Sequence, residues 1–157
     1  MEAPTIDLGI SDDARKAIAD GLGHVLADTY TLYLKTHGYH WNVTGPMFQT
    51  LHVLFEEHYN ELWMAVDDIA ERIRSLGHPA PAGYQAFAER TAIAPDEAHE
   101  AMAMVADLVK GHETVARTIR GLWATAEDAN DQGTLDVLTQ RLSVHEKTAW
   151  MLRSLLQ

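Results

Sequence analysis

Four residues with metal-binding side chains lie on one side of a segment with helical periodicity. They are His52, Glu56, Asp67 and Glu71. A helix turns by about 100° per residue, so the four side chains fall within one sector of about 100°. Imidazole and carboxylate groups of this kind bind iron, manganese or zinc. The pattern therefore indicates a metal site on one face of a helix.

The spacing of these residues excludes a site built by one copy of the helix. His52 and Asp67 are fifteen residues apart, which is about 22 Å along a straight helix. Metal–ligand distances are about 2 Å. Two antiparallel copies would instead place His52 and Glu56 of one chain opposite Asp67 and Glu71 of the other. The two-fold axis would pass near the midpoint of the helix, at Asn60, Trp63 and Met64.

Structural readings of the same residues remain open. Acidic residues on one side of a helix usually form a solvated face, and Glu71 could pair with Arg72 and Arg74. A histidine beside an apolar stripe is more often structural than a ligand. Trp63, in the middle of the sector, could anchor a dimer interface or act as an electron donor beside the site.

The surrounding pattern carries a family resemblance. Residues 40–52 read HWNVTGPMFQTLH, residues 67–77 read DDIAERIRSLG, and residues 138–155 read LTQRLSVHEKTAWMLRSL. These segments resemble the Dps family, the bacterial miniferritins of starvation and oxidative stress. The resemblance spans nearly the whole chain and implies one ferritin-like domain over residues 1–157.

The resemblance implies a ferroxidase site at a two-fold interface. The matching metal ligands are His40, His52 and Glu56 from one subunit, with Asp67 and Glu71 from its neighbour. Glu56 departs from the aspartate that is common in the family, but it keeps the carboxylate and adds one methylene. The family also implies a dodecamer, iron(II) and iron(III) as the bound metal, and hydrogen peroxide as the preferred oxidant.

Composition limits the alternatives. The chain has 157 residues, no cysteine and a formal net charge of −11. Any metal must therefore be held by histidine and carboxylate groups, and direct binding to DNA is not expected. No apolar run is long enough to span a membrane, and the first residues lack the features of a signal peptide, which predicts a cytoplasmic protein.

Four long amphipathic segments position the candidate ligands. They are expected near residues 12–40, 46–76, 95–127 and 131–157, with Ser11 as an N-cap and Gly77 just beyond the second helix. Apolar residues recur at helical spacing in each, Phe48 among them. The pattern predicts an all-α, ferritin-like four-helix bundle. The link between the second and third helices is long enough to cross the bundle and could carry one short helix over residues 84–90.

Other polar residues have weaker links to the site. His37 is close enough to be a supporting residue, while His58, His112 and His145 are expected to be hydrogen-bonded core residues. Asp131 and Asp136 lie in an acidic turn; by resemblance they could line a pore that admits iron, or they could simply form a capped, solvated turn.

The favoured function is a cage that oxidises iron(II) and stores the iron(III) mineral, protecting against oxidative stress. A larger ferritin is disfavoured because the chain has no Glu-x-x-His motif. A DNA-compacting stress protein is disfavoured by the acidic N-terminal segment. A cage that binds metal without turnover stays open, and an iron-oxidation assay would discriminate.

Overall fold

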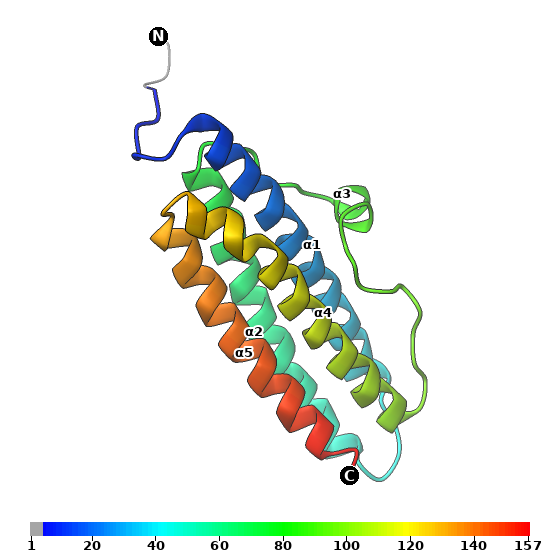
Figure 1. Cartoon of the computed structure of the whole chain (residues 1–157). Coiled ribbons are helices and arrows are strands. Elements are labelled where there is room, and N and C mark those ends of the chain that lie inside the picture. Colours follow the sequence, from blue (N-terminus) through cyan, green and yellow to red (C-terminus); the bar gives the residue numbers. More distant parts are fainter. Residues whose placement is uncertain (1–4) are drawn as a thin grey trace.

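The computed structural model describes residues 5–157, and within them the backbone is helical except at the connections and at the two ends (Figure 1). Four long helices and one short helix follow in order: α1 Asp12–Asn42, α2 Phe48–Ser75, α3 Tyr84–Ala88, α4 Ala101–Asp128 and α5 Gln132–Ser154. The predicted four-helix bundle with a short helix in its crossover is therefore confirmed.

The helices begin and end at residues whose chemistry explains the boundary. Ser11 caps α1 by accepting a hydrogen bond from the amide of Ala14 at 3.3 Å. Gly45 and Gly77 have φ angles of 100° and 92°, a region that favours glycine because it has no Cβ. Gly45 therefore allows the tight turn into α2, and Gly77 ends that helix.

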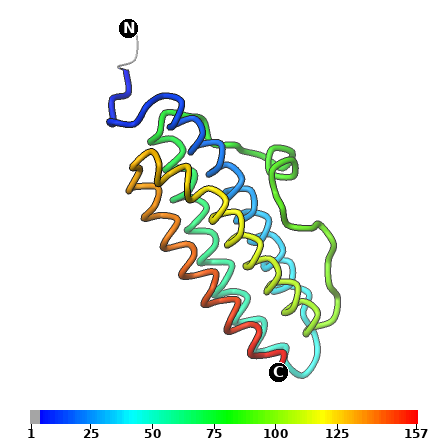
Figure 2. Tube along the Cα trace, in the orientation of Figure 1, coloured from blue at the N-terminus to red at the C-terminus, as the bar shows by residue number. Residues whose placement is uncertain are grey.

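The bundle is built from two hairpins joined by the crossover (Figures 1 and 2). α1 packs along α2, α4 packs along α5, and further contacts join α1 to α4 and α2 to α5. The crossover runs the length of the bundle outside α1, and α3 contacts α1. The C-terminal end of α5 consequently lies at the same end of the bundle as the α1–α2 turn.

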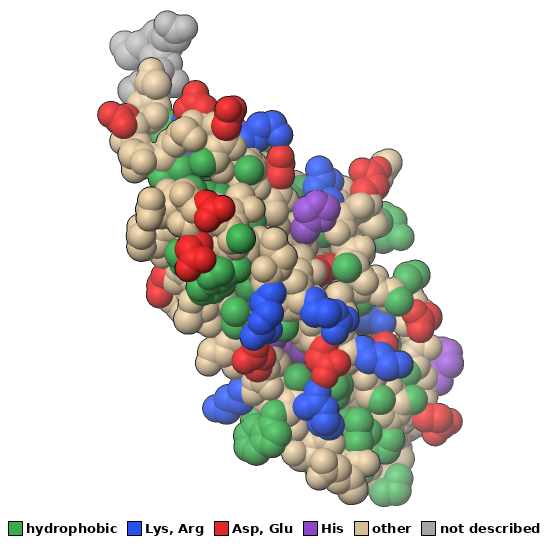
Figure 3. Space-filling model, viewed as in Figure 1, with side chains coloured by type: hydrophobic (Ala, Val, Ile, Leu, Met, Phe, Trp, Pro, Cys, Tyr) green, Lys and Arg blue, Asp and Glu red, His purple; other side chains and the backbone are tan. Residues whose placement is uncertain are grey.

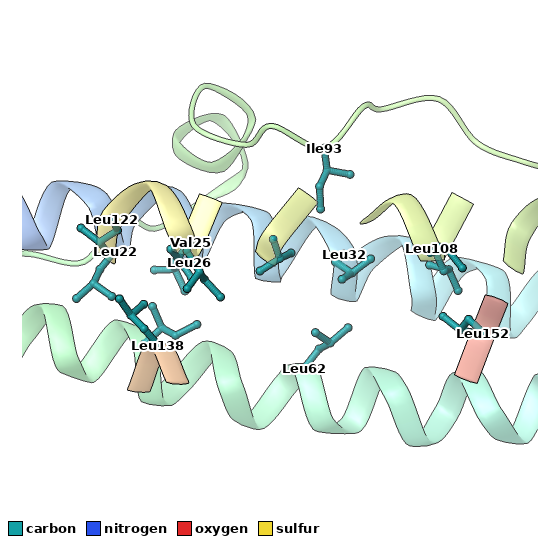
Figure 4. Packing of buried hydrophobic residues seen from close by; sticks show 14 of the residues in the cluster. Leu22, Val25, Leu26, Leu32, Leu62, Ile93, Leu108, Leu122, Leu138 and Leu152 are labelled. Atoms are coloured by element: carbon teal, nitrogen blue, oxygen red, sulfur yellow. The ribbon is translucent and has the colours of Figure 1, made fainter. Parts of the chain in front are cut away.

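Leucine side chains from all four long helices meet along the bundle axis (Figure 4). Leu22, Leu32, Leu62 and Leu138 are each 0% exposed. Ile93 of the crossover joins the same cluster and is 6% exposed. Burying such side chains stabilises a fold by about 1.5–3 kcal/mol each, so this core sets the relative positions of the helices.

The crossover is held by a carboxylate and a phenol that belong to α1. Asp28 is fully buried and accepts hydrogen bonds from the Thr91 hydroxyl at 2.8 Å and the Ala92 amide at 2.7 Å. Nearer α4, the Tyr39 hydroxyl accepts a hydrogen bond from the Ala98 amide at 2.9 Å. Residues 91–98 are not helical and α4 begins at Ala101, so the prediction that the third helix starts near Pro95 was wrong.

One apolar residue departs from the predicted stripe of α2. Phe48, expected to face the core, is the first residue of α2 and is 41% exposed. Its ring instead stacks on His52, with 5.0 Å between the ring centroids. The other residues of the predicted stripe are buried, such as Leu51 and Phe55, except for Val66, which is partly buried against the core.

Charge is distributed unevenly on the surface. Lys and Arg side chains gather over the middle of α4 and α5, although the chain is acidic (Figure 3). Two exposed arginines of these helices are ion-paired, Arg120 of α4 with Glu146 and Arg153, in the last turn of α5, with Glu113. In residues 5–157, no helix combines the length and the apolar character needed to cross a membrane.

Candidate metal centre

The last turn of α1 and the first turns of α2 bring two histidines together. His40 ends α1, and the turn through Gly45 returns the chain so that His52 lies beside it. The two imidazole rings stack with 3.8 Å between centroids and 15° between planes. His40 is 8% exposed, so the pair lies at the edge of the bundle with limited access to solvent. The expectation that the turn brings these two histidines together is confirmed.

A reciprocal pair of hydrogen bonds fixes both rings. The His40 Nδ1 lies 2.7 Å from the carbonyl oxygen of His52, and the His52 Nδ1 lies 2.8 Å from the carbonyl oxygen of His40. A carbonyl oxygen only accepts, so each Nδ1 carries a proton and donates it. In the neutral rings both Nε2 atoms then keep a lone pair, which is the tautomer that metal-bound histidines adopt.

The three carboxylates follow along α2. Glu56 lies one turn after His52, and Asp67 and Glu71 lie near the other end of the helix. All three side chains are exposed, and within residues 5–157 none of the three carboxylates accepts a hydrogen bond or forms an ion pair. The alternative in which Glu71 pairs with Arg72 is not seen, because Arg72 bonds Asp131 instead.

One subunit does not bring all five predicted ligands together. His40 and His52 are in contact, but Asp67 and Glu71 are several helical turns away on the same straight helix. Among the described residues, no three histidine, aspartate or glutamate side chains are close enough to hold one metal ion. The middle of the intervening face is apolar and uncovered, since Trp63 is 52% exposed and Met64 is 67% exposed.

Aromatic rings surround the histidine pair. Tyr59 of α2 lies against His40, at 5.2 Å between centroids, and against His37, at 4.3 Å. His37 was predicted as a supporting residue, and its ring contacts are consistent with that role. Tyr59 and Tyr33 were missed by the sequence reasoning, although Tyr33–His37 and Tyr59–Trp63 have the four-residue spacing that places side chains on one helix face.

The two acidic residues proposed for a pore lie in different environments. Asp131 is 1% exposed; it accepts hydrogen bonds from the Thr134 amide at 3.0 Å and from Arg72 at 2.6 Å. It therefore caps α5 and does not face solvent as a pore residue must, so that expectation is corrected. Asp136 is exposed and accepts a hydrogen bond from Gln140 at 2.8 Å.

A second polar cluster lies inside the bundle. Arg141 pairs with Glu61 and donates to the His145 Nε2 at 3.1 Å, and the His145 Nδ1 lies 2.9 Å from the His112 Nδ1. Since arginine only donates, the His145 Nε2 accepts and its Nδ1 donates to His112. This confirms that His112 and His145 are hydrogen-bonded core residues. His58 differs, because within the described chain its buried Nδ1 has no hydrogen-bond partner.

Burial controls the charge of this cluster. Together with the neighbouring His58 and Arg141, it lowers the pKa of His112 to about 3. Burial also lowers the pKa of His145 well below its usual value, with smaller contributions from His112 and Arg141. Both rings are therefore neutral at physiological pH. Arg141 and Glu61 were not identified from the sequence, although Arg141 and His145 have helical i, i+4 spacing.

Comparisons with known proteins agree with this architecture. A family model described as "Ferritin-like domain" matches residues 19–157. The chain is 40% identical over 98% of its length to an uncharacterised low temperature-induced protein of Nostoc, of which it covers 88%. It is 35% identical over 90% of its length to DNA protection during starvation protein 2 of Bacillus anthracis, of which it covers 97%.

Solved structures give the same result. The Dps protein of Vibrio cholerae O1, described as a ferritin-like diiron-carboxylate protein, aligns over 100% of both chains with a TM-score of 0.93 and 28% identity. DpsC of Streptomyces coelicolor aligns over 98% of this chain and 91% of its own, with a TM-score of 0.92 and 30% identity. The chain therefore belongs to the Dps group of the ferritin-like family.

Proposed function

We propose that this protein is a ferroxidase that forms an iron-storing cage and protects against oxidative stress. Iron is the substrate, and it binds where the candidate centre of one subunit meets that of a neighbour. The observation that carries the proposal is the paired state of His40 and His52, whose Nδ1 atoms are occupied and whose Nε2 atoms keep lone pairs. The relatives described as starvation-protection and diiron-carboxylate proteins support it.

The second half of the centre comes from a two-fold related subunit. Asp67 and Glu71 are exposed and unpaired within residues 5–157, and the uncovered Trp63 and Met64 lie between them and the histidines. An antiparallel contact over this apolar patch would bring the carboxylates of one subunit to the His52 end of its partner. Assembly would thus both bury the patch and complete the ligand set, in a cage that we expect to be a dodecamer in the cytoplasm.

The chain's own residues perform the chemistry of binding and positioning. The histidine lone pairs and the carboxylates hold two iron(II) ions near one another, and the negative carboxylates favour iron(III) over iron(II) once an electron has left. Each iron ion supplies one electron, so two ions together reduce one hydrogen peroxide molecule. Its O–O bond breaks and both oxygen atoms become hydroxide or water, without release of a hydroxyl radical.

The role of Asp67 is tested by replacing it with alanine. Asp67→Ala should slow peroxide-driven iron(II) oxidation by at least about tenfold, because loss of even an outer-sphere partner typically costs a metal site that much. Alanine favours helix, so the fold should persist. The matched control is Asp68→Ala, one residue along and also exposed, which should oxidise iron at the wild-type rate. Equal rates for the two variants would remove Asp67 from the centre.

Sharing of the centre between subunits is tested by complementation. Mixed assemblies of His52→Ala and Asp67→Ala subunits contain interfaces in which one centre is intact and the other carries both changes. Partial recovery of iron oxidation is expected after co-refolding. Mixed cages verified by mass spectrometry that recover no activity would contradict a shared centre.

The second candidate is a cage that binds metal without turnover. The same ligand set would serve it, and the relatives' names do not describe an activity. Stopped-flow measurement of iron(III) formation after mixing iron(II)-loaded protein with peroxide separates the two. Saturable binding of iron(II) with no acceleration of its oxidation would favour the non-catalytic cage.

A further inference from the structure

A pocket lies between the first half of α1 and residues 78–90 of the crossover, which runs outside that helix (Figure 1). Its volume is about 570 Å³, within the range of roughly 300–1,000 Å³ that is typical of small-molecule sites. Pro79 and Pro81 line the crossover side, and their fixed φ angles limit the freedom of that wall. None of the five predicted metal ligands lines this pocket, so it is separate from the candidate metal centre.

The side chains around the pocket carry more positive than negative charge, although the whole chain has a net charge of −11. Lys16 of α1 and Arg90 of the crossover line it, and both are positively charged at neutral pH. Asp20 is the one carboxylate among the lining residues, and Lys16 already pairs with it at 2.7 Å. His24 and His78 complete the polar lining. This excess of positive charge favours an anion as the ligand.

Two hydrogen bonds hold Arg90 in place beside α1. The Arg90 Nη1 donates to the carbonyl oxygen of Ala86 at 2.9 Å, and the His24 Nδ1 lies 3.0 Å from the carbonyl oxygen of Arg90. A carbonyl oxygen only accepts, so the His24 Nδ1 carries a proton, and in the neutral ring its Nε2 keeps a lone pair. The pocket therefore combines guanidinium N–H groups, which donate to an oxyanion, with an imidazole nitrogen, which accepts from an O–H group.

Gly23 leaves room for a ligand next to the Arg90 guanidinium. It is a buried residue inside α1, and its helical backbone does not require glycine. A Cβ at this position would lie 3.5 Å from the Pro81 Cγ and 3.9 Å from the Arg90 Nε, both ordinary van der Waals distances. Alanine would thus fit, and it would favour the helix more than glycine does. What glycine provides at this position is open space between α1 and Arg90.

A metal ion fits this pocket less well than an anion. Within residues 5–157, no three histidine, aspartate or glutamate side chains are close enough to hold one metal ion, and this includes Asp20, His24 and His78. The positive charges of Lys16 and Arg90 would also repel a cation. The donors, the charge and the space all favour a small oxyanion.

We propose that this pocket binds hydrogen phosphate. The Arg90 guanidinium donates charge-assisted hydrogen bonds to its oxygen atoms, and Lys16 adds positive charge nearby. The His24 Nε2 accepts from the P–O–H group, which hydrogen phosphate keeps at neutral pH and which sulfate lacks. A phosphate monoester has mostly lost this proton at neutral pH, so free phosphate is the better ligand. The inference does not depend on the proposed function, because the two sites use different residues.

The test is equilibrium dialysis of iron-free, assembled protein against radiolabelled phosphate at neutral pH. Wild-type protein should bind phosphate saturably, with about one site per subunit. Sulfate and a nucleoside monophosphate should each compete several-fold less well than unlabelled phosphate. Chloride at the same ionic strength should have little effect, because it cannot bridge several donors or donate to His24.

Two variants and their matched controls locate the site. Arg90→Gln should weaken phosphate binding by about tenfold, because it removes the charged donor. Gly23→Ala should weaken binding several-fold by filling the space beside Arg90, while the thermal midpoint without phosphate stays equal or rises. Lys110→Gln makes the same charge change at an exposed position of α4, and an added Cβ at Gly121 would meet nothing within 4 Å. Lys110→Gln and Gly121→Ala should both bind phosphate as wild type does.

Several results would overturn the inference. Absence of saturable binding to wild-type protein would refute the site, as would equal losses in Arg90→Gln and Lys110→Gln. Sulfate that competes as well as phosphate would refute hydrogen phosphate as the specific ligand. Duplex DNA that displaces phosphate more effectively than free phosphate does would show a nucleic-acid surface instead. Iron oxidation is no part of the measurement, so each of these results leaves the ferroxidase proposal standing.

Discussion

The buried histidine pair in the bundle core should make the stability of the protein fall as the pH decreases. His112 and His145 are 2% and 0% exposed, and both are neutral because burial lowers the pKa of each. In the unfolded chain they regain the ordinary histidine pKa of about 6.5. Below that pH the unfolded state binds protons that the folded state excludes, so protons favour unfolding.

The magnitude follows from the pKa of His112, which burial lowers from 6.5 to about 3. Stability from this residue is fully present above pH 6.5 and is lost progressively as the pH falls towards the folded pKa. The loss approaches about 1.4 kcal/mol per pH unit below pH 6 and amounts to about 2.3 kcal/mol between pH 6.5 and pH 4.5. That is a substantial part of the 5–15 kcal/mol typical of a folded domain.

The neighbours of the pair strengthen the effect. Arg141 on α5 is always charged, and Glu61 on α2 is already engaged by it. His58, also on α2, has a pKa that burial lowers as well, although Glu57 and Glu61 raise it. A proton on either core histidine would thus lie near the positive charge of Arg141, and Glu61 is already paired with that arginine. The second histidine of the pair becomes still harder to protonate once the first is charged.

The measurement is urea unfolding at a series of pH values and at one protein concentration, since assembly contributes to apparent stability. His112→Asn should be less stable than wild type at pH 7.5 and should lose stability more slowly between pH 6.5 and pH 4.5, by up to about 1.4 kcal/mol per pH unit. His99→Asn, at an exposed position, should keep the wild-type slope. Equal slopes for wild type and His112→Asn would refute the reasoning.

Three further predictions concern other parts of the molecule. Asp28→Ala should lower the free energy of unfolding by about 2 kcal/mol, because it removes the fully buried acceptor of three hydrogen bonds, from Thr91, Ala92 and Thr118. Urea unfolding against the exposed Asp96→Ala measures this. Asp131→Asn should lower the free energy of unfolding by roughly 3 kcal/mol, because it breaks the buried ion pair with Arg72. Asp136→Asn should instead slow iron(II) uptake at low salt by up to about tenfold and leave the free energy of unfolding unchanged. The protein should not retard DNA in a gel at moderate salt, because its acidic surface repels phosphates; a salt-sensitive shift abolished by Arg117→Gln would instead implicate the arginines of α4 and α5.

The sequence by itself determined the helices and the face of α2 that carries the ligands. The apolar periodicity and the capping residues are local properties, so Ser11, Gly77 and the short helix α3 were predicted close to their observed positions. The spacing of His52 and Asp67 already required two copies of the helix, because helical rise is a fixed quantity. The four-helix bundle followed from the number and length of these segments, and the structure confirms it.

Only the tertiary structure decided which polar groups meet across the bundle. Three contacts depend on partners more than 30 positions apart in the sequence: Asp28 with Thr91, Glu61 with Arg141, and His112 with His145. The same holds for Asp131, whose acidic surroundings suggested an exposed turn until Arg72 and Thr134 were seen to enclose it. No local pattern encodes such pairings, because a hydrogen bond between two helices depends on how each is rotated about its axis, and the packing of the whole core sets that rotation.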